Sequence, residues 1–204
     1  LSVLDPKSTP SGDPAEVAEE LTPLLEDKNL QLLEPSDASD TNAFVVTQET
    51  ADEFGLATMS DLAEPSGDLV LGAPSECPDR PFCIPGLKDT YGIEFADFKP
   101  LEYGAATAQA LSADAIDVAL LFSTDPLIEQ EGFVLLEDDQ QLQAADYITP
   151  LASADLDEEA IELLNAVSAS LVTDEITALN ARVGLEQEDA ADVAKEYLEE
   201  KGLL

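Results

Sequence analysis

EFADFKPLEYGAATAQALSADAIDVALLF, residues 94–122, carries the pattern that decides the fold. A short strand near 94–99 leads into a helix over 105–112, and the apolar run 116–122 is typical of a buried strand. A helix between two strands usually joins strands that run parallel in one sheet. The stretch therefore predicts an α/β protein with a parallel sheet that helices cover on both sides.

The same alternation continues on both sides of this unit. Upstream, Thr58 and Asp61 have the spacing of a capping box that opens a short helix. Downstream, a strand at 133–136 precedes a loop that contains Tyr147. The remaining expected elements are strands at 44–47 and 68–73 and helices at 49–54 and 86–91.

The two ends of the chain differ from this central block. The first 14 residues are rich in Pro, Ser, Gly and Asp, and a helix over 14–25 and a brief strand over 30–33 follow. Beyond Pro150 the pattern predicts helices alone. Asp155 and Glu158 form a capping box for the first, Thr173 caps the second, which Gly184 ends, and the third covers about 188–200.

We therefore divide the chain into three segments. Residues 38–150 form an α/β lobe that is large enough to build a core of its own. Residues 1–37 and 151–204 flank this lobe, and we expect the C-terminal helices to return and pack with the N-terminal segment as another lobe.

The chain carries a large excess of carboxylates. Its 45 Asp and Glu against 8 Lys and Arg give a net charge of −37, so DNA, RNA and anionic membrane surfaces are repelled. We exclude nucleic acid as a partner. Because the charge is spread over a chain that is 45% apolar, we expect a folded protein adapted to high salt, which screens the self-repulsion.

The sequence lacks residues that several kinds of functional site require. The chain has no histidine, which excludes a Ser-His-Asp or Cys-His hydrolase and argues against a Cys/His zinc site. No Gly-rich phosphate loop is present, and paired acids carry little information among so many carboxylates. We therefore expect no metal, no cofactor and no enzymatic activity. No run approaches the 18 or so apolar residues of a membrane-spanning helix.

The loop ECPDRPFC, residues 76–83, holds both cysteines and one of two arginines. Cys77 and Cys83 can close a small disulfide ring, which favours an oxidising compartment. Such a ring would present the Arg80 guanidinium as a fixed fork for a carboxylate. The alternative is a surface ion pair between Arg80 and one of the acidic residues of the loop.

Pieces along the chain resemble those of a known family in their order and spacing. They are DTNAF at 40–44, TMSDL at 58–62, the cysteine loop with IPGLK at 84–88, YG at 91–92, DVALLFSTD at 117–125, LEDD at 136–139, LN at 179–180 and VAKEYL at 193–198. Together they are similar to the osmoprotectant-binding proteins of ABC importers, the glycine betaine, choline and carnitine receptors of the OpuC and ProX type.

The resemblance implies a type II periplasmic-binding-protein fold. Its two lobes have parallel-rich sheets flanked by helices, and they close around one small ligand. Members of the family usually have further residues ahead of the part that matches here. We therefore interpret residues 1–37 as the remnant of an incomplete first lobe.

The resemblance also assigns aromatic residues to ligand binding. Aromatic faces hold a quaternary ammonium group, and each contact contributes about 0.5–2 kcal/mol. By resemblance, Phe44, Phe122 and Tyr147 form three walls of an aromatic cage. Similar receptors have tyrosine at the positions of the two phenylalanines, and the alternative for both is a core aromatic at the end of a strand.

Four polar residues complete the expected binding set. Arg80 would hold the carboxylate of a betaine or carnitine. Asn42 would either bond a ligand oxygen or hold the neighbouring backbone. Ser123 and Thr124 would offer hydroxyl groups to the cleft.

Other polar and aromatic residues are left out of this set. Asp125 is better explained as a helix N-cap, because Pro126 directly after it suits the first helical position. Tyr91, Tyr103 and Tyr197 are interpreted as packing or surface residues.

The sequence thus predicts an extracytoplasmic solute receptor, periplasmic or lipid-anchored at the outer face of the cell membrane. It would bind a quaternary-ammonium osmoprotectant such as glycine betaine and deliver it to the permease of an ABC importer. Binding would close the two lobes. The alternative is a ligand-silent sensory or interaction domain of the same fold.

Overall fold

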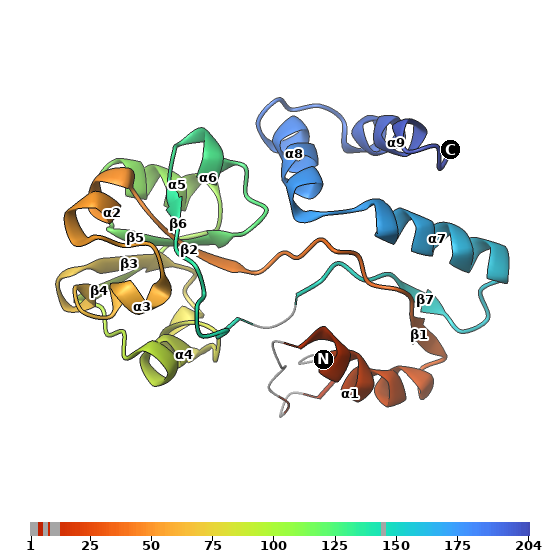
Figure 1. Cartoon of the computed structure of the whole chain (residues 1–204), viewed down its shortest axis with the longest axis horizontal. Coiled ribbons are helices and arrows are strands. Elements are labelled where there is room, and N and C mark those ends of the chain that lie inside the picture. Colours follow the sequence, from red (N-terminus) through yellow and green to blue (C-terminus); the bar gives the residue numbers. More distant parts are fainter. Residues whose placement is uncertain (1–3, 6–7, 9–12, 144–145) are drawn as a thin grey trace. The chain divides into compact units, whose positions relative to one another are not determined.

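The computed structural model describes residues 4–5, 8, 13–143 and 146–204, and the chain divides into two compact units (Figure 1). Unit 1 combines residues 1–40 with residues 145–204, and unit 2 is Thr41–Ala144. Unit 2 lies within the segment 38–150, so the alternating strands and helices fold together. None of the described helices is long and apolar enough to cross a membrane.

Unit 2 is built on a five-stranded mixed sheet with the order β4-β3-β5-β2-β6 (Figure 1). The strand β3 is parallel to β4 and to β5, whereas β2 is antiparallel to β5 and to β6. The prediction of a parallel sheet is therefore wrong for β2, because the apolar pattern of a buried strand is the same in both directions. The strands are β2 Asn42–Val46, β3 Val70–Ala73, β4 Asp97–Pro100, β5 Val118–Phe122 and β6 Val134–Leu135.

Helices pack on both faces of this sheet. One face carries the larger core cluster, to which α2, α3 and the turns around α4 contribute, and the other face is covered by α5 and α6. The capping box at Thr58 and Asp61 is present as predicted. The helices are α2 Gln48–Phe54, α3 Met59–Leu62, α4 Ile84–Gly86, a π-helical turn Leu87–Tyr91, α5 Ala105–Ser112 and α6 Leu127–Gln130, with 3₁₀ turns at Ser66–Asp68 and Cys77–Asp79.

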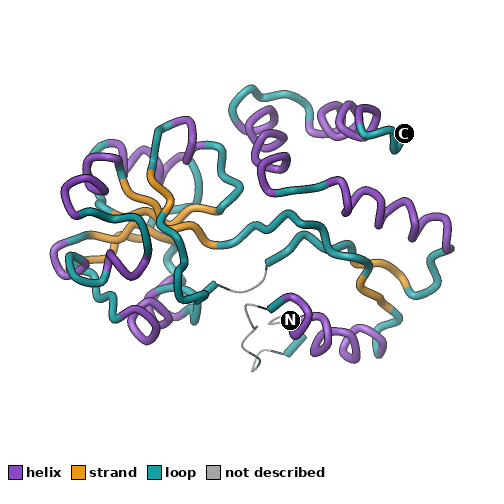
Figure 2. Tube along the Cα trace, viewed as in Figure 1, coloured by secondary structure: helices purple, strands orange, loops and turns teal. Residues whose placement is uncertain are grey.

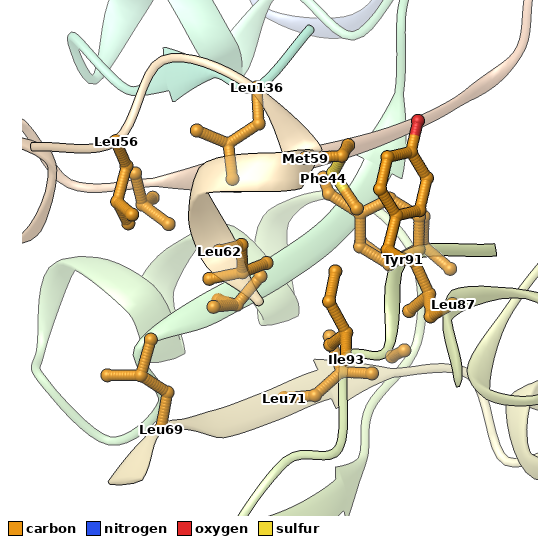
Figure 3. Close-up of a cluster of buried hydrophobic side chains, with 14 of the residues drawn as sticks. Phe44, Leu56, Met59, Leu62, Leu69, Leu71, Leu87, Tyr91, Ile93 and Leu136 are labelled. Atoms are coloured by element: carbon orange, nitrogen blue, oxygen red, sulfur yellow. The ribbon is translucent and has the colours of Figure 1, made fainter. Parts of the chain in front are cut away.

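The strand β2 separates two hydrophobic clusters. Phe44 and Val46 belong to the larger cluster, and Ala43 and Val45 belong to the smaller one, because successive side chains of a strand point to opposite faces. Figure 3 shows Phe44 within the larger cluster, together with residues of the neighbouring strands and helices. The strand is therefore buried on both sides.

The described part of unit 1 contains a two-stranded antiparallel sheet and four helices (Figure 2). The strand β1 pairs with β7, a strand of three residues that the sequence did not predict. The elements are α1 Pro14–Glu26, β1 Leu30–Leu32, β7 Leu151–Ser153, α7 Glu158–Ser170, α8 Thr173–Gly184 and α9 Ala190–Glu200.

Two helix starts in unit 1 differ from the prediction. Asp157, not Asp155, caps α7 by accepting the N–H of Ala160 at 3.0 Å. Val172 occupies the N-cap position of α8, and the Thr173 hydroxyl instead accepts the N–H of Ser39 at 3.2 Å. Acids and hydroxyls are so frequent in this chain that a capping motif does not identify a single position.

Candidate functional site

Loops from several strands of unit 2 meet at one edge of its sheet. Because β3, β4 and β5 are parallel, their carboxyl ends lie at the same edge, and β2 begins there since Asn42 pairs with Phe122. Ligands of open α/β sheets bind just beyond this kind of edge. We call it the carboxyl edge, made of Asn42 and the loops 74–83, 101–104 and 123–126.

Arg80 extends from the loop that follows β3. A disulfide joins Cys77 to Cys83 across this loop, with 5.3 Å between the two Cα atoms. Both cysteines are 1% exposed and belong to the larger core cluster. The loop is thus anchored in the core on both sides of Arg80, which starts from a fixed backbone.

The guanidinium of Arg80 makes an unusual contact for so acidic a protein. Across the described residues its group takes part in no ion pair, so neither acidic residue of the loop neutralises it. Instead, Nη1 donates a hydrogen bond to the Tyr103 hydroxyl at 3.1 Å. The surface ion pair that the sequence left open is not formed.

Tyr103 joins Arg80 to an aromatic pair. Its ring stacks on Phe122, the last residue of β5, with the ring centroids 4.4 Å apart and the planes inclined by 24°. Burial raises the pKa of Tyr103, although the charge of Arg80 opposes the shift. The hydroxyl is therefore neutral at physiological pH and accepts the bond from the guanidinium.

The prediction that Tyr103 is a packing or surface residue is confirmed, since the residue packs against the larger core cluster. What the prediction missed is the contact of its hydroxyl with Arg80, which follows from the place of Tyr103 in the short loop between β4 and α5. A signal was present, since the residues that follow a parallel strand reach the carboxyl edge. The neighbouring Gly104, with φ of +81°, makes the sharp turn into α5.

Asn42 uses its amide within the protein. The Nδ2 group donates to Gln143 Oε1 at 2.9 Å and to the Phe82 carbonyl at 3.4 Å. Gln143 Nε2 donates to the same carbonyl at 3.2 Å. These bonds tie the start of β2 to the disulfide loop. The sequence allowed two roles for Asn42, bonding a ligand oxygen or holding the neighbouring backbone, and the bond to the Phe82 carbonyl corresponds to the second. No motif in the sequence pointed to Gln143.

The segment 138–143 is ordered by the carboxylate of Asp138. That carboxylate accepts a hydrogen bond from the Tyr91 hydroxyl and from the N–H groups of Leu142 and Gln143, at 2.9 and 2.8 Å. Burial and the bond to Asp138 raise the pKa of Tyr91. Tyr91 is a core residue, and its hydroxyl fixes the segment that holds Asn42.

Ser123 and Thr124 lie beside Phe122 at the carboxyl edge. The Ser123 hydroxyl accepts the N–H of Thr41 at 3.0 Å, and Thr124 is 4% exposed. Asp125 Oδ1 accepts the N–H of Leu127 at 3.0 Å and so helps to cap α6, although Pro126 occupies the N-cap position.

Phe44 lies away from the carboxyl edge. It pairs with Leu120 inside the sheet, whereas Phe122 pairs with Asn42 at the end of the strands. Its side chain is 2% exposed and is surrounded by the larger core cluster. The structure therefore places Phe44 in the core, the alternative that the sequence left open, and its ring is not accessible as the wall of a cage.

Tyr147 belongs to unit 1. It forms an isolated antiparallel bridge with Ser39, and its side chain is exposed. It lines a pocket of that unit together with residues of α1 and β1 and their neighbours, namely Val17, Ala18, Leu21, Leu32, Leu33, Pro35 and Thr149. Of the predicted binding residues, Asn42, Arg80, Phe122 and Ser123 therefore come together at the carboxyl edge. Thr124 lies beside them but is buried, so its hydroxyl is not open to a cleft as predicted. Tyr147 does not share their unit.

Comparison with known proteins matches the chain to one family. The substrate binding domain of the ABC-type glycine betaine transport system matches residues 7–200. A solved structure of a glycine betaine/carnitine/choline ABC transporter superposes with a TM-score of 0.81 at 28% identity, covering 99% of this chain and 76% of that chain.

Two curated proteins show a similar degree of likeness. The glycine betaine-binding protein YehZ of Escherichia coli (strain K12) is 28% identical over 189 residues, which cover 87% of this chain and 62% of YehZ. The carnitine transport binding protein OpuCC of Listeria monocytogenes is 28% identical over 165 residues, covering 79% of this chain and 53% of OpuCC. The matched part of this chain thus spans less than two thirds of either relative.

Proposed function

Since this chain belongs to the family of substrate-binding domains of ABC-type glycine betaine transport systems, we propose that it is an extracytoplasmic solute receptor. Its ligand is a quaternary-ammonium osmoprotectant, with glycine betaine as the leading candidate. It delivers this ligand to the permease of an ABC importer, so its role is binding and not catalysis.

One observation carries this proposal, the Arg80 guanidinium beside the stacked rings of Tyr103 and Phe122. Glycine betaine and carnitine each join a trimethylammonium group to a carboxylate. The trimethylammonium group has no N–H to donate and is attracted to aromatic faces. The carboxylate is best held by the two parallel N–H bonds of an arginine. The carboxyl edge offers both kinds of partner.

The charge of the protein makes Arg80 important for a ligand that carries a carboxylate. With a net charge of −37, the surrounding field attracts the onium group and repels the carboxylate. A carboxylate ligand therefore needs a local cation, and the Arg80 charge is not neutralised by an ion pair in the part of the chain that the structure describes.

Calorimetric titration with glycine betaine, carnitine, choline and ectoine tests the proposal. We expect saturable heat from glycine betaine and carnitine, and Arg80→Ala should strongly weaken the binding of both. Lys88→Ala is the matched control, because it removes one positive charge from an exposed ion pair of the same unit, and it should leave binding unchanged.

The titration distinguishes recognition by Arg80 from recognition by the aromatic rings alone and from a domain that binds no ligand. Binding of choline as tight as that of glycine betaine, and unaffected by Arg80→Ala, would place recognition in the rings alone. Absence of binding by all four compounds would overturn the receptor function and favour the ligand-silent domain.

A further inference from the structure

We propose that Tyr103 is a positioning residue that couples the carboxylate clamp to the aromatic face, so that the site prefers zwitterionic onium compounds to purely cationic ones. The inference rests on the proposed function and adds the residue that sets its selectivity. It follows from the two simultaneous contacts of one side chain.

The first contact orients the guanidinium. Tyr103 accepts a hydrogen bond from Arg80 Nη1, which leaves the edge formed by Nε and Nη2 for a carboxylate. An arginine has five N–H donors in a rigid planar fork. A long exposed side chain that is already held in place loses less conformational freedom when the ligand binds. The Tyr103 hydroxyl therefore favours the binding of ligands that carry a carboxylate.

The second contact orients the aromatic face. The Tyr103 ring stacks on one face of Phe122 at 4.4 Å. Stacking fixes the plane of the Phe122 ring at the end of β5. Tyr103 thus contacts both groups that would recognise the ligand, the Arg80 guanidinium and the Phe122 ring.

The backbone that carries Tyr103 is itself fixed. The N–H of Leu101 donates to the Ala73 carbonyl at 2.9 Å, which ties the loop after β4 to the end of β3. The buried Thr107 hydroxyl donates to the Glu102 carbonyl at 2.6 Å, which ties the loop to α5. Tyr103 is therefore held from both sides, as a residue that positions others must be.

The test separates the hydroxyl from the ring. Tyr103→Phe keeps the stack and removes the bond to Arg80, so the Kd for glycine betaine should rise about threefold to tenfold, the effect of one hydrogen bond. The Kd for choline should stay unchanged. Tyr103→Leu removes the stack as well and should weaken both ligands. Tyr197→Phe, which removes a hydroxyl in unit 1, is the control and should alter neither Kd.

A double-mutant cycle tests the coupling itself. In the Arg80→Ala background, Tyr103→Phe should cause no further loss of glycine betaine affinity, because the hydroxyl then has no guanidinium to hold. Additive losses, an equal loss for betaine and choline in Tyr103→Phe, or no loss at all would each overturn the inference.

A readout without ligand distinguishes failure of this inference from failure of the proposed function. Burial raises the pKa of Tyr103, and the charge and the hydrogen bond of Arg80 partly offset this effect, so Arg80→Ala should raise that pKa further in a spectrophotometric titration. The titration step that disappears in Tyr103→Phe is the one that belongs to Tyr103. An unchanged pKa would overturn the coupling even if betaine binds. If Arg80→Ala raises the pKa of Tyr103 as expected but no onium compound binds, the contact between the two residues stands. The proposed preference for zwitterionic ligands and the receptor function are then both overturned.

Discussion

At the residue scale, the disulfide loop depends on a glycine that is not part of it. Gly86 lies in α4 beneath the loop, and a Cβ atom there would be 2.1 Å from the Pro81 carbonyl oxygen and 2.6 Å from Leu142 Cδ1. The first neighbour is backbone and belongs to the loop that presents Arg80. Only a residue without a side chain lets this loop lie against the helix.

We therefore expect Gly86→Ala to destabilise unit 2 by about 1–3 kcal/mol, the usual effect of overpacking. The loop must shift to make room, so affinity for glycine betaine should fall as well. Urea unfolding and titration of the variant check both effects. Gly67→Ala is the matched control, since a Cβ at Gly67 meets nothing within 4 Å. Equal stability of the two variants would contradict this explanation.

The two phenylalanines show what the sequence can and cannot predict about a site. Phe44 and Phe122 lie on neighbouring strands, and the resemblance gave both the same role. The register of those strands separates them, because Phe122 pairs with the first residue of β2 and Phe44 lies two residues further in. Side-chain type and strand pattern are readable from sequence, but the register decides which ring reaches the edge.

At the element scale, locally encoded features were predicted well. The helix over 105–112 has the bounds of α5, and the apolar run 116–122 contains β5. Both depend on patterns within a few residues. The direction of β2 and the pairing of β1 with β7 depend on partners far away in the sequence, and no local pattern encodes them. The same holds for Gln143, which reaches Asn42 across 101 positions.

The segment 138–143 offers a test at this scale. Tyr91→Phe removes the hydroxyl that donates to Asp138 and accepts the N–H of Gln140 at 2.8 Å. Two polar groups then lose a partner, and we expect a loss of about 1–3 kcal/mol in the free energy of unfolding. The segment should also loosen, because Asp138 organises its backbone.

Hydrogen exchange locates the effect. The amides of Leu142 and Gln143, which donate to Asp138, should exchange faster in Tyr91→Phe than in the original chain. The amide of Ile161 in α7 serves as the internal reference in unit 1. Uniformly faster exchange in both units would show a global effect and contradict the local role of Tyr91.

At the scale of the whole molecule, the dominant feature is the unbalanced charge. The chain has 45 acidic and 8 basic residues, so most carboxylates cannot have a basic partner of their own. In the described part of the chain, the ion pairs Lys88–Glu94 and Lys195–Glu199 are largely exposed, whereas Arg182–Glu188 and Lys201–Glu175 are about one-third exposed. Exposed pairs contribute little to stability, and they leave the repulsion among the remaining acids unopposed.

This imbalance predicts that thermal stability rises with NaCl. Raising the salt from 0.1 to 1 M shortens the Debye length from about 10 to about 3 Å, which removes repulsion between carboxylates on the surface. The melting temperature should therefore increase over this range, as circular dichroism can measure. Sucrose at equal osmolality is the control, because it stabilises by exclusion without screening charge. A melting temperature that sucrose raises as much as NaCl, or that NaCl leaves unchanged, would show that repulsion does not limit this fold.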